Sequence, residues 1–293
     1  MFSVYLLFLM SGCDKDGGEI VQEPDITEEP PEPTPFPLFI GDVEITQSPP
    51  RVVSLSPSLS EIVYELGYGS RIIGRGSYCD FPPVITEAPD TGSAANPDVD
   101  KIISLSPYLV LTTAPLSGMD MFRMEQSGIK TLVIPASENI SSLREVYRVL
   151  GLVFEGLFTG IEAGDEAFAL ISKVCDNTGV LNIGKFVYIT GDMKAATGDT
   201  LESSIFSCFG ENIAADGGNY DFDLSLLSEN QPDIILLNDK YTADDLLASE
   251  NFSELDAVIG GKIIFIDNSA FERPSIRLAL LVEKMIADYR DLQ

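Results

Sequence analysis

Short apolar runs rich in β-branched residues recur along the chain from residue 51 to residue 266. Continuous apolar runs without polar alternation are typical of strands buried on both faces of a parallel sheet. The runs lie at 51–55, 71–74, 109–113 and 131–135, and again at 185–190, 233–237 and 262–266. They predict parallel strands in both halves of the chain.

Helical patterns separate the predicted strands. Ser58-Leu-Ser-Glu61 has the spacing of a capping box, which predicts a helix that runs to Leu66 and ends in a left-handed cap at Gly67. Because strands and short helices alternate, the predicted fold class is α/β with parallel sheets. Further helices are expected at 99–105, 117–128, 202–209, 223–230, 244–249 and 276–290.

Residues 142–178 carry no strand pattern. Ser142 opens a second capping-box sequence, and apolar residues then recur at helical spacing. Gly160 and Gly164 are expected to divide the segment into a short helix and a longer one over 161–177, which would span about 25 Å at 1.5 Å per residue. A helix of that length can bridge two lobes. The predicted domains are an N-terminal lobe at 51–141, a linking helical segment at 142–180 and a C-terminal lobe at 181–293.

An internal echo links the two halves. The segment 98–107 (DVDKIISLSP) precedes the strand predicted at 109–113, and the segment 223–232 (DLSLLSENQP) precedes the strand predicted at 233–237. Both segments have the pattern of a helix, a proline and an apolar strand, which favours two lobes of related architecture. Since such junctions are common in α/β proteins, chance similarity stays open.

The first ten residues, MFSVYLLFLM, are uncharged and apolar. The run is too short to span a bilayer but fits the apolar part of a signal peptide. Ser11-Gly12-Cys13 follows and resembles a bacterial lipobox, which predicts a signal peptide over 1–13 and a lipid on Cys13. Residues 14–50 hold ten acids and eight of the 18 prolines, so an extended acidic linker is expected there. The alternative is a buried N-terminal segment with an incidental cysteine.

Charge and composition exclude several classes of function. The chain has 46 acidic and 18 basic side chains, and its net charge of −28 repels nucleic acid. It contains no histidine, which excludes metal receptors built on imidazoles and hydrolases of the Ser-His-Asp or Cys-His type. Cys79, Cys175 and Cys208 show no Cys-x-x-Cys spacing, so no zinc or iron–sulfur site is expected, and one disulfide stays open.

Six sequence blocks together carry a family resemblance. They are RVVSLSPSLSEIVYELGYGSRIIGRGSYCDFPP (51–83), NPDVDKIISLSPYLVL (96–111), SCFGENIAAD (207–216), LSENQPDIILL (227–237), LDAVIGGKIIFID (255–267) and AFERPSIR (270–277). In this order they resemble the class III substrate-binding proteins of ABC importers, whose ligands are cobalamin, ferric siderophores and haem. The resemblance covers about residues 51–290.

The resemblance implies two Rossmann-like lobes joined by a single long α-helix, with the ligand in a cleft between them. It implies an extracytoplasmic, lipid-anchored monomer that catalyses nothing and needs no cofactor of its own. Such a receptor captures a whole metal chelate and delivers it to an ABC permease and its ATPase. Because the metal arrives already coordinated, the receptor needs no imidazole.

The YCDFPP and FERPSIR sequences are most similar to those of the cobalamin-binding members. Tyr78 matches the tyrosine that lines their cleft, and Phe271 and Arg273 lie where an arginine approaches ligand amides. Tyr220 is a further candidate for a ligand-facing ring. For Tyr78 the alternative is a packed loop aromatic, and for Arg273 it is a salt bridge to Glu272 or another acid.

The ligand-binding rings of the relatives are partly missing. Cobalamin-binding relatives commonly use tryptophans, of which this chain has none. Ala94, Ala195 and Asn219 lie near where bulky rings are expected. Cobalamin is therefore in doubt, and a related corrinoid or a siderophore stays open.

The resemblance also implies one acidic docking residue on each lobe, which pairs with a permease arginine. Asp100 falls on the position of the first lobe. The second position is Ser225, and Asp223 is the candidate to replace it. With so many acids, either aspartate could simply be a solvated charge. A sensor that signals without transport, and an extracellular enzyme that uses a carboxylate pair, are further alternatives.

Overall fold

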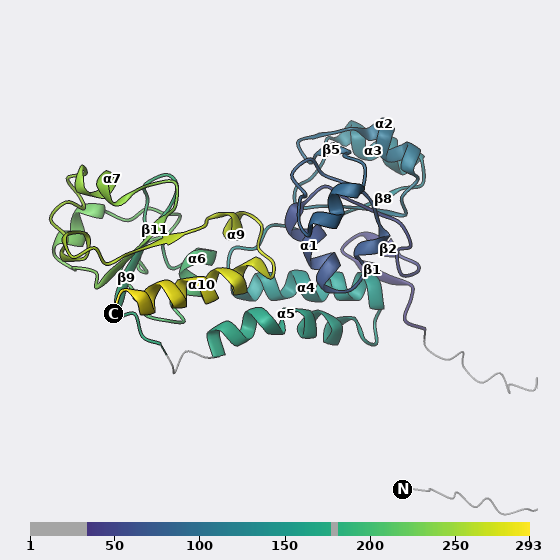
Figure 1. Cartoon of the computed structure of the whole chain (residues 1–293). Helices are drawn as coiled ribbons and strands as arrows, with labels where there is room; N and C mark the ends of the chain where they lie inside the picture. The colour runs from purple at the N-terminus through teal and green to yellow at the C-terminus, as the bar shows by residue number, and fades with distance from the viewer. Residues whose placement is uncertain (1–33, 177–180) are drawn as a thin grey trace, which may run out of the picture. The chain divides into compact units, whose positions relative to one another are not determined.

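Two parallel four-stranded sheets form the two lobes of the chain (Figure 1). The structure is a computed structural model, and it describes residues 34–176 and 181–293. The sheet orders are β4-β3-β7-β8 and β10-β9-β11-β12, so the first strand of each lobe lies between the second and the third. The strands are β3 Val52–Ser54, β4 Ile72–Arg75, β7 Leu109–Thr112, β8 Lys130–Val133, β9 Lys185–Ile189, β10 Glu211–Asn212, β11 Ile234–Asn238 and β12 Ile263–Ile266.

The α/β class with parallel sheets is confirmed, and all seven predicted strands form. The central strands β7 and β11 are buried along their whole length, which explains their continuous apolar sequence. The helix α2 (Val99–Leu105) leads into β7, and the 3-10 helix η4 (Leu224–Ser228) leads into β11. The two segments of the internal echo thus occupy equivalent places in two sheets of the same topology.

The remaining helices surround the two sheets (Figure 1). They are α1 Pro57–Glu65, α3 Gly118–Gln126, α6 Leu201–Phe206, α7 Ala243–Leu247, α8 Asp256–Ile259, α9 Ser269–Glu272 and α10 Arg277–Asp291, with 3-10 helices η1 Gly69–Arg71 and η2 Pro83–Glu87. Two short strands, β5 Gly92–Ser93 and β6 Asn96–Pro97, pair with each other.

Two helices begin earlier than their capping-box sequences predict. The N-cap of α1 is Ser56, followed by Pro57, whose missing N–H costs nothing in the first turn. Glu61 instead lies buried inside α1. In α4 (Ile140–Glu155) the N-cap is Asn139, and Ser142 is the third helical residue, which closes a reciprocal capping box with Asn139. Both predicted starts were therefore wrong by two or three residues.

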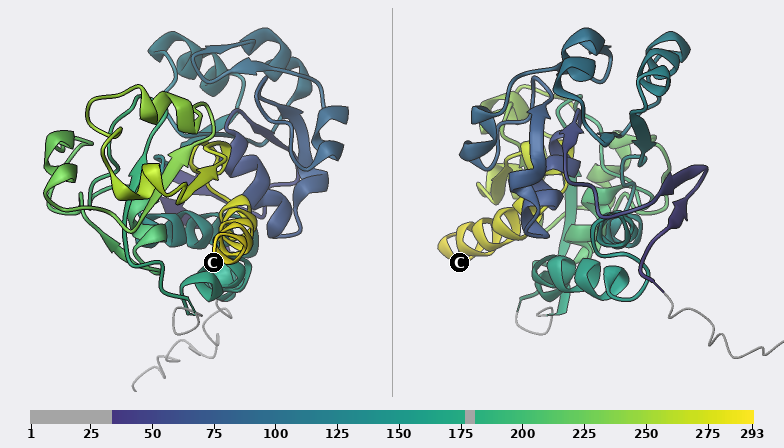
Figure 2. Two further views of the ribbon diagram at one scale, coloured as in Figure 1. Left: turned by 60° about the vertical axis from the view of Figure 1, so that its left-hand side comes forward. Right: turned by 90° about the vertical axis from the view of Figure 1, so that its right-hand side faces the viewer.

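The linking segment consists of two antiparallel helices, α4 and α5 (Gly160–Asp176), which lie beneath the N-terminal lobe in Figure 1 and extend toward the C-terminal lobe. The views in Figure 2 place α10 beside this pair. The prediction of a short first helix is wrong, because α4 has 16 residues and α5 has 17. The chain turns at Gly156, whose φ is 79°, whereas Gly164 lies inside α5.

Glycines let the backbones of α4 and α5 approach closely. A Cβ atom at Gly151 would lie 2.0 Å from the carbonyl oxygen of Gly160. A Cβ atom at Gly164 would lie 2.6 Å from the carbonyl oxygen of Tyr147. Gly164 is thus a packing residue and does not end a helix.

A β-hairpin precedes the N-terminal lobe. It consists of β1 Leu38–Ile40 and β2 Val43–Ile45, and it buries Leu38 and Ile45 in the main core. The prediction of an extended linker over 14–50 is therefore wrong for its last part, since the compact unit begins at Pro35. The high proline content obscured the alternating sequence around the turn at Gly41, whose φ is 56°. The predicted signal peptide, Cys13 and the linker up to residue 33 lie outside the described residues.

One hydrophobic cluster extends from one sheet to the other. It contains Val52 and Leu59 of the N-terminal lobe, Leu150 and Ile171 of the helix pair, and Phe186 of the C-terminal lobe. Two smaller clusters cover the other faces of the two sheets. The helix pair is thus part of a core that both lobes share. Within the part of the chain that the structure describes, none of the helices is long and apolar enough to cross a bilayer.

The sequence left open whether the cysteines are free or form one disulfide. Cys208 is disulfide-bonded, and Cys79 is a free thiol buried against Ser60, whose hydroxyl lies 3.3 Å from its sulfur. Burial raises the pKa of the Cys79 thiol, which keeps it protonated and unreactive.

Candidate functional site

A cavity of about 620 Å³ lies where the strands of the C-terminal sheet end. Thr190 follows β9, Asn238 ends β11, and Asp267 follows β12. Ligands of α/β proteins bind at this carboxyl edge of a parallel sheet. Thr190, Asn238 and Asp267 were not predicted from the sequence. The signal that could have identified them is a polar side chain at or just after the end of each apolar run.

A second cavity of about 370 Å³ shares two wall residues with the first, Glu202 and Tyr220. Its other walls include Glu138 from the segment before α4, Asn219 and Phe271. Together the two cavities offer room for a bulky organic ligand. The structure thus brings the predicted residues Tyr220 and Phe271 into one site.

Glu202 lies between the two cavities. It is the second residue of α6, is 8% exposed, and accepts a hydrogen bond from the hydroxyl of Tyr220 at 3.2 and 3.3 Å. Burial raises the pKa of its carboxyl group, opposed by hydrogen bonds. Burial of the Tyr220 hydroxyl, together with the nearby Glu202 carboxylate, raises the pKa of Tyr220 to about 12 by disfavouring its negatively charged form. Glu202 was not predicted.

The loop that carries Tyr220 is in an unusual backbone conformation. Asn219 and Tyr220 have φ values of 54° and 58°, a region that bulky residues rarely adopt. The loop is held there because the Asn219 amide donates to Asp199 and the Tyr220 amide donates to Thr197. Strain of this kind is found mainly at functional sites.

Phe271 packs between core and cavity. Its ring meets those of Tyr188 and Phe206 at centroid distances of 6.0 and 5.5 Å. The hydroxyl of Tyr188 donates to Asn268, another wall residue, at 2.9 Å. The cavity floor is therefore rigid and partly aromatic.

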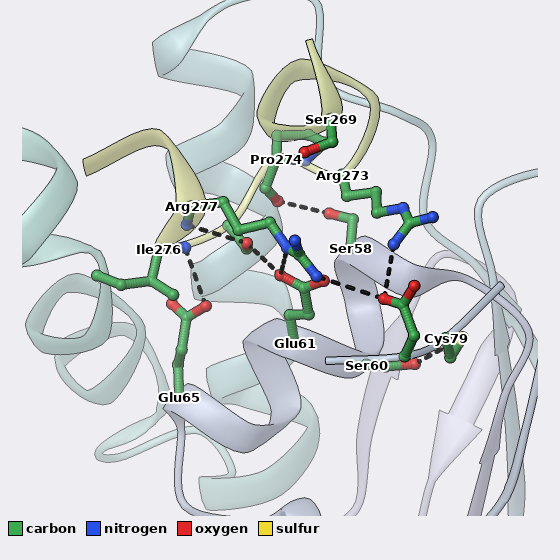
Figure 3. A network of polar contacts seen from close by, with 12 residues as sticks. Ser58, Ser60, Glu61, Glu65, Cys79, Ser269, Arg273, Pro274, Ile276 and Arg277 are labelled. Atoms are coloured by element: carbon green, nitrogen blue, oxygen red, sulfur yellow. Dashed lines mark hydrogen bonds and ion pairs between the residues drawn. The ribbon is translucent and has the colours of Figure 1, made fainter. Parts of the chain in front are cut away.

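A polar network joins the N-terminal lobe to the segment between α9 and α10 (Figure 3). Arg277 donates to both carboxylate oxygens of Glu61 at 2.9 Å, and its guanidinium lies 4.5 Å from the centroid of the Phe81 ring. Arg273 pairs with Asp80 at 2.6 Å. We call this group the interlobe network, whose members are Ser58, Glu61, Glu65, Asp80, Arg273, Ser275 and Arg277.

Arg273 belongs to the interlobe network and lines neither of the two cavities described. Arg273 is engaged by Asp80, the kind of ion pair that the sequence left as its alternative role. Tyr78, two residues before Asp80, is 67% exposed and lines neither cavity among the described residues. Roles for Tyr78 and Arg273 in ligand binding remain predictions.

Glu65 is the member of the interlobe network whose pKa is raised by burial. It accepts hydrogen bonds from the Tyr147 hydroxyl and from the Ile276 amide, the latter at 3.0 Å. Burial, with a smaller repulsion from Glu61, raises the pKa of Glu65 to about 7. The folded state therefore binds a proton that the unfolded state releases at a lower pH.

Replacing Glu65 with glutamine is expected to remove part of the pH dependence of stability. Because the pKa is raised on folding, the wild type loses stability as the pH rises from about 5 to 8, by about 2 kcal/mol. Urea unfolding at both pH values should show this loss in the wild type and in Glu145→Gln, a control at an exposed site. An equal loss in Glu65→Gln would contradict this assignment.

The other predicted positions are distributed over both lobes. Asp100 is exposed and paired with Arg123, and Asp223 is exposed and caps η4. Ala195 is buried in the C-terminal lobe, and Ala94 packs against the outer core of the N-terminal lobe. Among the described residues no group of acidic and cysteine side chains is arranged to hold a metal ion.

Comparisons with known proteins agree with the fold. The chain is 26% identical over 276 residues to the uncharacterized ABC transporter substrate-binding lipoprotein YvrC of Bacillus subtilis, covering 85% of this chain and 84% of that protein. It is 24% identical over 261 residues to a cobalamin-binding protein of Halobacterium salinarum, covering 83% and 70%. The solved vitamin B12 binding protein BtuF of Vibrio cholerae superposes with a TM-score of 0.63 at 19% identity, covering 84% and 98%.

The profile of the periplasmic binding protein family matches residues 52–270, which include both parallel sheets and the helix pair between them. The match therefore covers most of the folded unit and all the described wall residues of both cavities except Phe271 and Glu272. This chain belongs to the periplasmic binding protein family.

Proposed function

We propose that this chain is the extracytoplasmic receptor of an ABC importer, which captures a metal chelate and delivers it to the permease. The observation that carries the proposal is the 620 Å³ cavity at the carboxyl edge of the C-terminal sheet, in a chain of this family. The described relatives are binding proteins, so we assign no catalysis to the site.

A corrinoid is the first candidate ligand. One relative is named for cobalamin binding, and one similar structure is a vitamin B12 binding protein. Haem and catecholate-siderophore binding proteins also share the fold, so haem and ferric siderophores are the alternatives. The ring of Tyr220 and the face of Phe271 supply apolar contact area for any of these flat or bulky chelates.

Delivery requires a membrane partner. We propose that a lipid on Cys13 anchors the receptor, in agreement with the lipoprotein name of its relative. The exposed carboxylates of Asp100 and Asp223 are the proposed contacts to permease arginines. Such exposed pairs steer the encounter more than they add affinity.

The proposal is tested by titrating the purified chain with cobalamin, cobinamide, haem and ferric siderophores. At least one chelate is expected to bind with a Kd below about 10 μM, and Tyr220→Ala should weaken that binding about tenfold. Tyr289→Ala is the matched control, because Tyr289 lies on α10 and lines neither cavity among the described residues. Absence of binding for every chelate would refute the receptor function.

A further inference from the structure

The walls of the two cavities are strongly acidic. Among the described residues, the larger cavity is lined by five carboxylates and two lysines. The smaller cavity adds two carboxylates and no further cation from the described residues. The acids are Glu138, Asp192, Asp199, Glu202, Asp239, Asp267 and Glu272, and the cations are Lys194 and Lys240.

Two of these carboxylates are stabilised in the ionised form by hydrogen bonds. Hydrogen bonds from Thr197 and Asn219 lower the pKa of Asp199, and hydrogen bonds from Ser269 lower that of Asp267. One lysine is partly engaged, since the Lys240 ammonium donates to the carbonyl of Gly191 at 2.9 Å. A concave wall with a large excess of negative charge concentrates its electric field on any ligand that enters. A polyanionic ligand would be repelled here, and a cationic one attracted.

Glu202 differs from the other acids because it is buried. At 8% exposure it lines both cavities, yet it forms no ion pair with any described residue. A carboxylate offers about four acceptor sites. Glu202 accepts from the Tyr220 hydroxyl at the long distances of 3.2 and 3.3 Å, and it also accepts from the Thr200 side chain and from its own backbone N–H, but none of these donors is cationic. A buried carboxylate without a cationic partner is costly unless further donors reach it. A bound ligand in the cavity can supply such a donor to Glu202.

The strained loop at Asn219 and Tyr220 also indicates that Glu202 faces a ligand. The left-handed backbone at Asn219 and Tyr220 is what holds the Tyr220 ring next to Glu202. The strained backbone thus accompanies a site in which the apolar face of Tyr220 and the acceptor oxygens of Glu202 lie side by side.

On the basis of the function proposed above, we propose that Glu202 selects the ligand by accepting hydrogen bonds from amide or ammonium N–H groups at the edge of the chelate. The preferred ligand class is a neutral or cationic chelate whose edge carries such donors, as the amide side chains of a corrinoid do. Chelates whose edge carries carboxylates or catecholate charge are rejected. Aromatic surface from Tyr220 and Phe271 and the acceptor from Glu202 then act on the same ligand edge.

A panel of four chelates tests this selection on the wild type. Cobinamide is a cationic corrinoid with amide side chains, and ferrioxamine B is a ferric hydroxamate with an ammonium group. Haem carries propionates, and ferric enterobactin is a polyanionic catecholate. At least one of the first two is expected to bind at least tenfold more tightly than either of the last two. Tighter binding of haem or ferric enterobactin overturns the proposed selection but leaves the receptor function intact, whereas no binding at all refutes the receptor function itself.

The role of Glu202 is tested with Glu202→Gln, which keeps the shape and removes the charge. Affinity for the best cationic probe is expected to fall about tenfold, the range for a hydrogen bond to a charged group. Glu145→Gln is the control, because Glu145 is an exposed acid on α4 that pairs with Arg148. Equal affinity in Glu202→Gln and the wild type overturns the role of Glu202. Should Glu202→Gln fail to fold, the charge panel on the wild type still decides the selection.

Discussion

Replacing Glu61 with alanine is expected to lower the free energy of unfolding by about 3–5 kcal/mol, the range for breaking one side of a buried ion pair. Glu61 is 2% exposed and accepts from Arg277 and Ser275. Its loss leaves the Arg277 guanidinium, whose side chain is 22% exposed, without its main partner. Urea unfolding measures the effect.

The matched control is Glu145→Ala. Glu145 also pairs with an arginine, Arg148, but its side chain is 63% exposed, so its loss should cost less than about 1 kcal/mol. The double variant Glu61→Ala/Arg277→Ala should lose less than the sum of the two single variants. A loss of under 1 kcal/mol in Glu61→Ala would show that the interlobe network does not stabilise the fold.

Replacing Gly164 with alanine is expected to destabilise the chain by about 2–3 kcal/mol, in the range for overpacking a buried contact. In an exposed helix the same change would be favourable, because alanine is the better helix former by about 1 kcal/mol. Here the new Cβ would lie 2.6 Å from the carbonyl oxygen of Tyr147 and 2.6 Å from the Cα of Arg148. Both are backbone atoms, so α4 and α5 would have to separate.

Gly118→Ala is the control for this substitution. Gly118 is the first residue of α3, and a Cβ there meets nothing within 4 Å. Its effect on thermal unfolding should stay within about 0.5 kcal/mol. If Gly164→Ala were as stable as Gly118→Ala, the close approach of the two helices would not require glycine.

The fold was largely predictable because strands buried on both faces are continuous apolar runs. This signal is local, so all seven expected strands form. Packing between distant segments leaves no such signal. Nothing in the sequence around Gly164 distinguishes a helix break from a contact with Tyr147, and nothing around Glu61 distinguishes a cap from a partner of Arg277.

The candidate site was predictable only in part. Tyr220 and Phe271 lie together as side chains that could face a ligand. Glu202 was missed because an acid in the first turn of a short helix is an ordinary favourable choice. Its burial depends on Tyr220, which is 18 residues away in the sequence. The hairpin at 38–45 was missed because prolines dominate the composition around it.

The shared core has a consequence for how the protein responds to its ligand. Since one apolar cluster joins both sheets through α4 and α5, neither half has a complete interior of its own, and the two halves should melt together. Occupancy at the edge of one sheet then protects the whole unit, including the β1–β2 hairpin, against thermal denaturation and proteolysis, and the protection grows with the logarithm of ligand concentration once the site is filled.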